Sequence, residues 1–329
     1  SGYKLPWSKK MSVIIQGTGK ALPEKCMKNT EIASVIDTSD DWIKSHTGIT
    51  SRRVASETDT SATLASAACM SALQNACERG AVGLNADSVD LILCATATPQ
   101  YSGFPSNACL IQQALGAHNA ACFDLSAACS GFLYALDTAA SLMERHSWRY
   151  ALVCGSEVLT RIVDWKDRST CILFGDGAGA VVLENTFVRS GLGIGAVVLG
   201  ADGTGAGELY LDEENRIRMN GRAVYNFAVN VITETVNKLL EKEHLSIENI
   251  ELVVCHQANE RILEAAAKRL KYDPAKFVCN MENYGNTSAA SIPITLDDLM
   301  KSGRIGKGMT VITAGFGAGL TWGGCVIRF

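Results

Sequence analysis

The chain contains several short apolar runs in which hydrophobic residues do not alternate with polar ones. Such runs are typical of strands that are buried on both faces of a parallel sheet. Longer segments with helical spacing lie between them, and alternation of strands and helices favours an α/β fold. The predicted strands are 13–15, 91–95, 150–154, 180–183, 252–255 and 310–313, and the predicted helices are 63–78, 130–144, 223–243 and 260–270.

The pattern also repeats at a near-constant distance along the chain. The segment 90–95 resembles 251–256, an offset of 161 residues, and 151–155 resembles 310–314, an offset of 159. Chance similarity between two buried strands is common. The occurrence of several matches in the same order is therefore stronger evidence than either match alone. The order predicts two copies of one strand–helix unit.

The repeat divides the chain into residues 11–186 and residues 187–329, with a linker near the polar and glycine-containing segment 185–191. Cys129 and Asn286 each open a helix of similar pattern, 157 residues apart. We therefore expect Asn286 to occupy the repeat position of Cys129. Pseudo-symmetry would then bring both helix N-termini to one site.

Composition excludes several classes of protein. The 329 residues are 47% hydrophobic and 19% charged, which is too apolar for a disordered chain. A net charge of −4 argues against a nucleic-acid partner. No apolar run approaches the ~18 residues of a membrane helix, so no membrane insertion is expected. The first ten residues, Ser1–Lys10, are polar and basic, unlike a secretory signal.

The twelve cysteines include no CxxC pair, which argues against a zinc ribbon, and most lie in apolar runs. We expect no metal site, no disulfide scaffold and a reducing compartment. The glycine-rich run 175–179 is close to a dinucleotide-binding motif, but a predicted strand follows it where a Rossmann loop opens a helix. We interpret it as a tight turn.

Cys129 differs from the other cysteines because it follows an apolar run and precedes a helix. The N–H groups and dipole of a helix N-terminus stabilise a thiolate, which predicts a lowered pKa and a nucleophile. A packed capping cysteine is the alternative. A nucleophilic thiolate needs partner groups. His256 directly follows a predicted strand, where open α/β sheets place ligands, although a structural histidine is equally compatible. Asn286 is either a further partner or a helix N-cap.

These segments together resemble the β-ketoacyl-acyl carrier protein synthase III family, condensing enzymes of the thiolase superfamily. The resemblance runs from about Val13 to Phe329. It is carried by Thr38-Ser-Asp-Asp-Trp-Ile43, Ala127-Ala-Cys-Ser-Gly131, Phe174-Gly-Asp-Gly-Ala-Gly179, His256-Gln-Ala-Asn259, Gly285-Asn-Thr-Ser-Ala-Ala-Ser291 and Thr321-Trp-Gly-Gly324.

The resemblance implies an α/β fold of the thiolase-like, five-layered αβαβα type with two pseudo-symmetric halves, and a homodimer. It implies a catalytic triad of Cys129, His256 and Asn286. The implied reaction is a decarboxylating condensation of an acyl-CoA starter, expected to be acetyl-CoA, with malonyl-acyl carrier protein. The product is a 3-ketoacyl-acyl carrier protein that initiates type II fatty acid synthesis, and no cofactor is implied.

Three alternatives remain at this point. One is a related thiolase-superfamily acyltransferase or a condensing enzyme of secondary metabolism. Another is a cysteine hydrolase that uses the same triad. The last is a non-catalytic binding subunit, which the presence of all three triad residues disfavours. The compartment depends on the source: cytoplasmic in a bacterium, a plastid-type organelle in a eukaryote.

The resemblance also implies binding residues. The backbone N–H groups of Cys129 and Ala318 would form an oxyanion hole, although the family has glycine at position 318. Trp42 and Arg168 would sandwich the CoA adenine, and Gly221, Tyr225 and Asn259 would line the pantetheine tunnel. Phe316 would bound the acyl pocket of its own subunit, and Phe104 would close the acyl pocket of the partner subunit. Arg261, Lys268 and Arg269 would dock the carrier protein. His46 and Asn226 replace basic residues that are common in the family.

Overall fold

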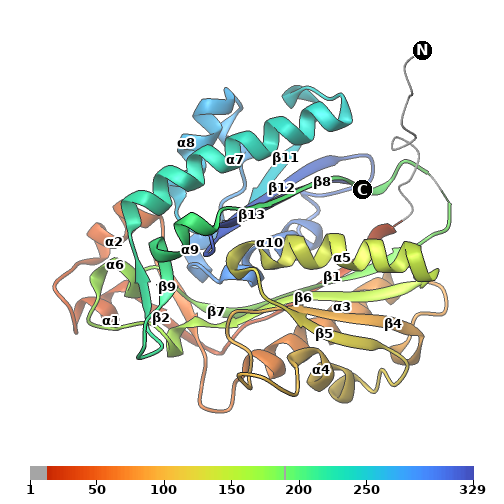
Figure 1. Ribbon diagram of the computed structural model, residues 1–329, viewed down its shortest axis with the longest axis horizontal. Coiled ribbons are helices and arrows are strands. Elements are labelled where there is room, and N and C mark those ends of the chain that lie inside the picture. Colours follow the sequence, from red (N-terminus) through yellow and green to blue (C-terminus); the bar gives the residue numbers. More distant parts are fainter. Residues whose placement is uncertain (1–12, 189) are drawn as a thin grey trace.

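The computed structural model describes residues 13–188 and 190–329, and Ser1–Lys10 lies outside this part. Two large sheets organise the chain (Figure 1). The first has the strand order β1 (Val13–Ala21), β7 (Asp176–Asn185), β6 (Tyr150–Val158), β4 (Val89–Ala95), β5 (Ala121–Leu125). The second has the order β8 (Gly193–Ala201), β13 (Thr321–Arg328), β12 (Thr310–Gly317), β11 (Leu252–Cys255).

The two sheets repeat one topology. In the first sheet β4 is parallel to β5 and β6, while β7 pairs antiparallel with both β6 and β1. In the second, β11 is parallel to β12, while β13 pairs antiparallel with both β12 and β8. In the second sheet, a parallel bridge joins Val253 of β11 to Phe277. This bridge has the position that β5 has beside β4 in the first sheet. The predicted parallel pairing is therefore confirmed for the central strands and wrong for 13–15 and 180–183.

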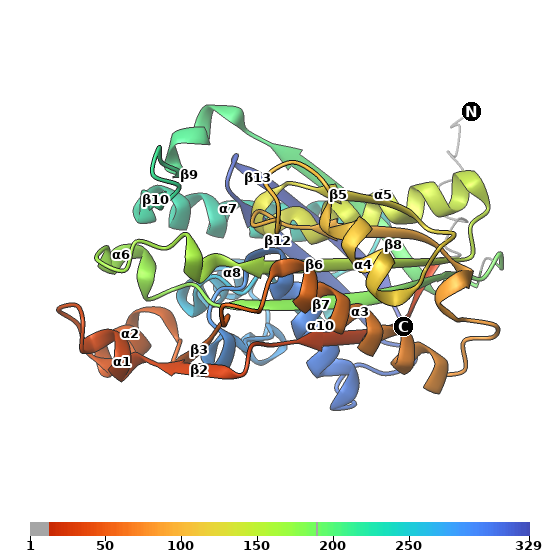
Figure 2. The ribbon, with the colours of Figure 1, turned by 90° about the horizontal axis from the view of Figure 1, so that it is seen from below.

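Helices fill three layers around the two sheets (Figure 1). Seen from below, the helices on the outer face of the first sheet lie in front of its strands (Figure 2). The long helix α3 (Ser61–Glu78) packs on the outer face of the first sheet, beside α4 (Asn107–Leu115). Both α5 (Gly131–His146) and α10 (Ser291–Lys301) lie between the sheets, and α7 (Gly221–Glu243) covers the second sheet beside α8 (Glu260–Leu270). This order of layers confirms the predicted αβαβα fold.

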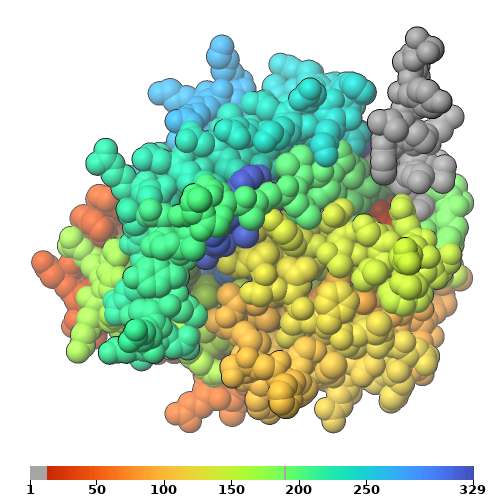
Figure 3. Space-filling model, in the orientation of Figure 1, coloured from red at the N-terminus to blue at the C-terminus, as the bar shows by residue number. Residues whose placement is uncertain are grey.

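Shorter elements surround one end of these layers. Two hairpin-like pairs and four short helices connect the large elements at that end. They are β2 (Lys25–Lys28), β3 (Ser51–Val54), β9 (Leu209–Leu211), β10 (Ile217–Met219), α1 (Asn29–Ala33), α2 (Asp40–Thr47), α6 (Arg168–Cys171) and α9 (Met281–Tyr284). The space-filling view shows blue atoms of the C-terminal segment between those of α5 and α7, so the halves meet closely (Figure 3). The division of the chain at residue 186 stays a prediction.

The backbone corrects the predicted repeat position of Cys129. Single 3-10 turns precede the two central helices: η3 (Ala128–Ser130) before α5 and η8 (Ser288–Ala290) before α10. Both turns begin in the left-handed region, with φ of 46° at Ala128 and 50° at Ser288. The offset is 288 − 128 = 160 residues, which matches the strand offsets. Ala289, and not Asn286, is therefore the structural counterpart of Cys129.

The glycine-rich run 175–179 is also not the tight turn that the sequence predicts. Residues 176–179 belong to β7, and Gly179 has no left-handed φ. A Cβ at Gly179 would lie 2.5 Å from the backbone N of Ile294, and one at Gly155 would lie 2.1 Å from the carbonyl O of Ala289. These glycines therefore allow η8 and the first turn of α10 to contact the first sheet directly.

Candidate active site

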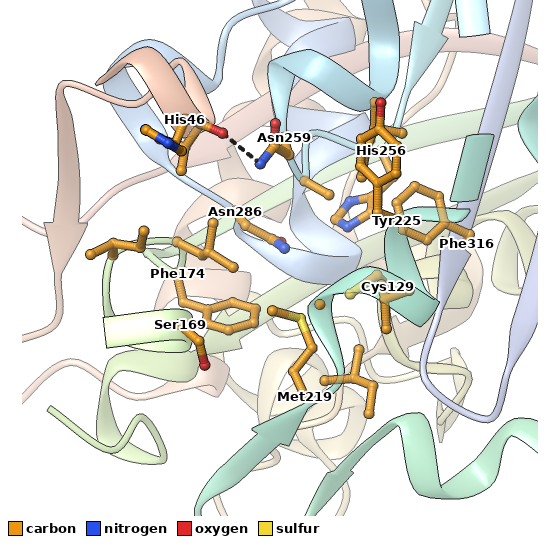
Figure 4. A pocket seen from close by; sticks show the side chains of 18 of the residues that line it. His46, Cys129, Ser169, Phe174, Met219, Tyr225, His256, Asn259, Asn286 and Phe316 are labelled. Carbon is orange, nitrogen blue, oxygen red and sulfur yellow. Dashed lines mark hydrogen bonds between the residues drawn. The ribbon is translucent and has the colours of Figure 1, made fainter. Parts of the chain in front are cut away.

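A pocket of about 210 Å³ opens between the two halves (Figure 4). Its lining includes eight of the residues predicted from the sequence. They are Cys129, His256, Asn286, Trp42, Gly221, Tyr225, Asn259 and Phe316. The side chains of Cys129, His256 and Asn286 point into one common space, although they come from three separate segments (Figure 4).

Cys129 occupies the middle of η3, at the elbow between β5 and α5, as the sequence predicts. Only 8% of the residue is exposed. Burial raises the pKa of its thiol to about 12, while a hydrogen bond with the Ser288 side chain lowers it and the charge of Glu157 raises it. The predicted lowering of this pKa is therefore not confirmed. The structure places Cys129 as a protonated thiol that needs a route for its proton.

His256 follows β11 and is buried in the pocket wall. Its Nδ1 lies 2.8 Å from Ser291 Oγ, which also accepts a hydrogen bond from the Gln257 N–H at 3.3 Å. We assign the ring proton to Nε2, the tautomer in which the Ser291 hydroxyl donates to Nδ1 while its oxygen accepts from Gln257. Burial lowers the pKa of His256 to about 3. His256 is therefore a neutral hydrogen-bond donor at physiological pH.

Asn286 is held by its own backbone and by a turn. Its N–H donates to the Leu173 carbonyl at 2.8 Å, and its carbonyl accepts from the Gly175 N–H at 3.0 Å. The side-chain Oδ1 accepts from the Ser288 N–H at 2.8 Å. That bond fixes the amide so that Nδ2 faces the pocket (Figure 4). The predicted N-cap role is absent, because α10 begins five residues later without a side-chain cap.

The backbone that follows β12 contacts the backbone of Cys129. A Cβ at Gly317 would lie 2.6 Å from the Cys129 N, so only glycine allows this approach. Ala318 is the next residue, and the left-handed conformation falls on Gly319, with φ of 132°. An alanine at 318 therefore meets no backbone conflict. The predicted oxyanion role of the Ala318 N–H stays a prediction.

The outer pocket carries the predicted nucleotide-binding residues. The rings of Trp42 and His46 stack with centroids 4.1 Å apart, and the Arg168 guanidinium lies 4.7 Å from the Trp42 centroid. A flat base between Trp42 and Arg168 needs about 7 Å, twice the stacking distance implied by van der Waals contact. The predicted sandwich would therefore require Arg168 to move away from Trp42.

Asn259 holds two helices together at the mouth of the pocket. Asn259 caps α8 by accepting from the Arg261 N–H at 2.9 Å, and its Nδ2 donates to the His46 carbonyl at 3.0 Å (Figure 4). This bond joins α8 to α2. Gly221 and Tyr225 begin α7, and both line the same opening.

The inner wall of the pocket is apolar and includes residues that the sequence analysis missed. Phe316 is buried, and its ring makes an edge contact with the His256 ring at 5.2 Å. The missed apolar residues come from the segment after α6 and from the β9 and β10 hairpin. They are Ile172, Leu173, Leu209 and Met219. Isolated apolar residues in loops carry no periodic signal in a single sequence.

Besides Arg168 and Ala318, four predicted residues lie outside the pocket lining. Phe104 is 91% exposed on the loop before α4. Arg261, Lys268 and Arg269 are exposed on α8, where Arg269 hydrogen-bonds Asn230 of α7. Their roles stay predictions, as does the effect of exposed Asn226.

Glu157 is a buried carboxylate that the sequence analysis also missed. It ends the apolar strand β6, and its Oε1 accepts from Ser288 Oγ at 3.0 Å. A single carboxylate in an otherwise apolar run was the available signal, because ionisable residues are rarely buried without a specific reason. Glu157 and Ser288 thus lie directly behind the triad.

The fold and the site together define a condensing enzyme of the thiolase superfamily. Family models described as 3-oxoacyl-[acyl-carrier-protein] synthase III match residues 123–203 and, for its C-terminal part, residues 240–329. The chain is 44% identical to β-ketoacyl-[acyl-carrier-protein] synthase III of Clostridium acetobutylicum, over 97% of this chain and 99% of that protein.

Solved structures agree with this assignment. The 3-oxoacyl-[acyl-carrier-protein] synthase III of Aquifex aeolicus is 43% identical, with a TM-score of 0.91 over 96% of this chain and all of that one. The priming β-ketosynthase of the R1128 polyketide pathway is 35% identical, with a TM-score of 0.89 over 99% of this chain and 98% of that one. The chain belongs to the β-ketoacyl-[acyl-carrier-protein] synthase III family.

Within residues 13–188 and 190–329, no three His, Cys, Asp or Glu side chains are arranged to hold a metal ion. In the same part of the chain, no helix is both long and apolar enough to cross a membrane.

The state of His256 predicts a pH dependence. Its folded pKa of about 3 lies below the ordinary histidine value of 6.5, so the unfolded chain binds the additional proton between these values. Stability due to neutral His256 is therefore complete above about pH 6.5 and is lost as the pH falls towards 3. Imidazole NMR should show no His256 titration between about pH 5 and 9. A midpoint within that range would contradict the assignment.

Proposed function

We propose that this chain condenses an acyl-CoA starter, acetyl-CoA by preference, with malonyl-acyl carrier protein and releases CO₂. The observation that carries the proposal is the common pocket of Cys129, neutral His256 and Asn286. Formation of an acyl thioester requires the thiolate of Cys129. The product is a 3-ketoacyl-acyl carrier protein, and the step initiates type II fatty acid synthesis in the cytoplasm of a bacterium.

His256 and Asn286 serve the second half-reaction. Loss of CO₂ from the malonyl group places negative charge on its thioester oxygen. The Nε2–H of His256 and the Nδ2–H of Asn286 are preorganised donors that can hydrogen-bond this oxygen, as in an oxyanion hole. A neutral histidine suits this role because it donates without giving up its proton. The carbanion that results attacks the acyl-Cys129 carbonyl, which the Cys129 and Ala318 N–H groups stabilise.

The substrates need no cofactor in this scheme, because the malonyl carboxylate supplies the carbanion. Acyl-CoA enters through the outer pocket, where its adenine displaces Arg168 from Trp42 and stacks between them. The pantetheine arm then passes Asn259, Gly221 and Tyr225 to reach Cys129.

A second candidate is the priming step of a polyketide pathway. The similarity to the R1128 priming ketosynthase, at 35% identity, supports it. The chemistry at Cys129 is the same in both cases, and only the starter and the carrier protein differ. The higher identity to the fatty acid synthases favours the first candidate.

The same proposal includes a homodimer. Strand β5 lies at the edge of the first sheet, and within the described chain its outer side pairs with no strand. Phe123 on β5 and Phe104 on the nearby loop are both exposed, Phe104 by 91%. Proteins seldom leave a long, partly apolar edge uncovered. A second copy would cover this edge and place Phe104 at the acyl pocket of its partner.

The half-reactions should separate by residue. Asn286→Ala removes one donor to the malonyl oxygen, and loss of such a donor costs about 100- to 1000-fold in rate. The variant should still form the acyl adduct at Cys129, seen by intact-protein mass spectrometry, but release little labelled CO₂. Cys129→Ala is the matched control, since it should form no adduct and retain some decarboxylation. Parent-rate decarboxylation by Asn286→Ala would show that the assigned role is wrong.

Carrier-protein docking should depend on the exposed basic face of α8. Arg261 and Lys268 lie seven residues, or two helical turns, apart. Reversal of both to Glu should raise the KM for malonyl-acyl carrier protein at least several-fold, with a larger effect at low salt because screening is weaker. Lys307→Glu is the control, because Lys307 is exposed in the loop before β12 and not on α8. Equal losses with malonyl-CoA would contradict docking on this face.

Removal of the Phe104 ring should enlarge the acyl pocket across the dimer. Phe104→Ala should therefore accept longer acyl-CoA starters than the unmodified protein, measured as relative kcat/KM over a chain-length series. Analytical ultracentrifugation reports the oligomeric state of both proteins. An unchanged chain-length profile, or sedimentation of the unmodified protein as a monomer, would refute this arrangement.

A further inference from the structure

The side-chain amide of Asn286 has two orientations, and only one of them suits the proposed function. A turn of 180° exchanges the N–H₂ group of an amide for its oxygen. With Nδ2 towards the pocket, Asn286 can donate to the malonyl oxygen (Figure 4). With Oδ1 there, it would repel the negative charge that develops on that oxygen. Decarboxylation therefore requires a group that selects the first orientation.

The backbone N–H of Ser288 makes this selection. It donates to Asn286 Oδ1 at 2.8 Å. A turned amide would place Nδ2 against the same N–H, and two donors cannot bond each other. The orientation of Asn286 thus depends on the position of Ser288. That residue has a left-handed φ of 50°, which a residue with a side chain keeps only where its surroundings hold it.

Glu157 holds Ser288 from the opposite side. Ser288 is buried, and its Oγ donates to Glu157 Oε1 at 3.0 Å. The elements that carry the two residues, η8 and β6, contact each other. Ser288 is thus bonded through its hydroxyl to the carboxylate and through its backbone to the amide. Two consecutive hydrogen bonds connect Glu157 to Asn286.

The Glu157 carboxylate is itself fixed in place. The residue has no exposed surface. Its oxygens accept from the N–H groups of Ala97 and Thr98 and from the hydroxyls of Thr96 and Thr98, at 2.7–3.3 Å. Burial of a carboxylate without such partners is costly, so the carboxylate stays where these donors are. Glu157 is therefore a rigid anchor in the first half for a turn of the second half.

The pseudo-symmetry of the fold separates this contact from the needs of folding. With the 160-residue offset, Glu157 corresponds to Gly317 and Ser288 to Ala128. A Cβ at Gly317 would lie 3.2 Å from the Ala128 Cβ, so strand end and turn also meet in this copy. Ala128 adopts the left-handed conformation without a hydroxyl or a carboxylate. The polar version occurs in the half that carries Asn286, as expected if it serves the amide.

We propose that Glu157 is a positioning residue for decarboxylation, which acts through Ser288 to hold the Asn286 amide with Nδ2 towards the malonyl oxygen. This inference rests on the proposed function. Neither Glu157 nor Ser288 lines the pocket, and neither exchanges a proton in this role. An amide at position 157 can therefore replace the carboxylate, because it can accept from the 96–98 segment and donate to Ser288 Oγ.

The kinetic test uses protein whose Cys129 has first been acetylated by acetyl-CoA, so that ionisation of the thiol does not enter. Malonyl-acyl carrier protein is then added, and labelled CO₂ is measured in a single turnover. Ser288→Ala keeps the backbone N–H but loses the bond to Glu157, and it should slow CO₂ release about 10- to 100-fold, as small displacements of reacting groups do. Glu157→Leu should slow it at least as much, whereas Glu157→Gln should stay close to the unmodified rate.

A double-mutant cycle shows whether these residues act through Asn286. In the Asn286→Ala background, Ser288→Ala should cause no further loss, because the amide that it positions is absent. A general loss of structure would instead lower the rate in both backgrounds. Ser288→Ala also keeps the test open if Glu157→Leu does not fold, since Ala128 shows that alanine adopts this conformation, with φ of 46°.

A second readout follows the amide without catalysis. In ¹⁵N-Asn-labelled protein, the Nδ2 signals of Asn286 are identified by their absence in Asn286→Ala. They should shift or broaden in Ser288→Ala, because the amide then samples both orientations. Thr160→Val is the matched control, since the buried Thr160 hydroxyl also donates to a buried carboxylate, that of Asp176, away from the pocket lining. It should change neither the signals nor the rate.

The outcomes distinguish this inference from the proposed function. Unchanged CO₂ release or unchanged Asn286 signals in Ser288→Ala would overturn the positioning role. An equal loss in both backgrounds of the cycle would overturn it as well, as would a loss in Glu157→Gln as large as in Glu157→Leu. If the unmodified protein forms no acyl adduct or releases no CO₂, the proposed function is wrong, and the Asn286 signals still decide whether Ser288 and Glu157 hold the amide.

Discussion

Direct backbone contact between the two halves is the constraint on which the active site depends. Gly155 of the first sheet receives the Ala289 carbonyl, and Gly317 of the second sheet receives the backbone of Cys129. The contacts are reciprocal, since each half inserts a turn against the strand end of the other. A side chain at either glycine would separate the turns and move Cys129 away from Asn286. Close packing of this kind tolerates little change in volume.

The same contacts bury the ionisable side chains of the site. Cys129, His256 and Glu157 lie between two sheets, so water cannot stabilise their charged forms. Burial raises the pKa of Cys129 to about 12 and lowers that of His256 to about 3. Both residues are therefore neutral before substrate enters. A neutral histidine suits the proposed role of hydrogen-bond donor, because it donates without giving up its proton.

Pseudo-symmetry explains how one site uses two different halves. The turns η3 and η8 share a left-handed first residue and open equivalent helices. Their chemistry has diverged completely, since Cys129 corresponds to Ala289 and Glu157 corresponds to Gly317. Asn286, whose amide is the proposed hydrogen-bond donor, precedes its turn by two residues and has no such counterpart in the other half. A duplicated scaffold thus positions groups that are not themselves duplicated.

The sequence by itself determined the layered α/β fold and singled out Cys129, His256 and Asn286, which the structure brings to one pocket. Apolar runs of fixed length, helical spacing and the order of motifs are local signals that a single chain displays. The repeat position of Asn286, the antiparallel direction of β7 and the role of the glycines in 175–179 were predicted wrongly. Strand direction and close approach depend on partner segments elsewhere in the chain, which local pattern does not report. Only the tertiary structure decided that the thiol is buried and that Glu157 and Ser288 lie behind it, because burial and pKa arise from the packing of segments that are remote in sequence.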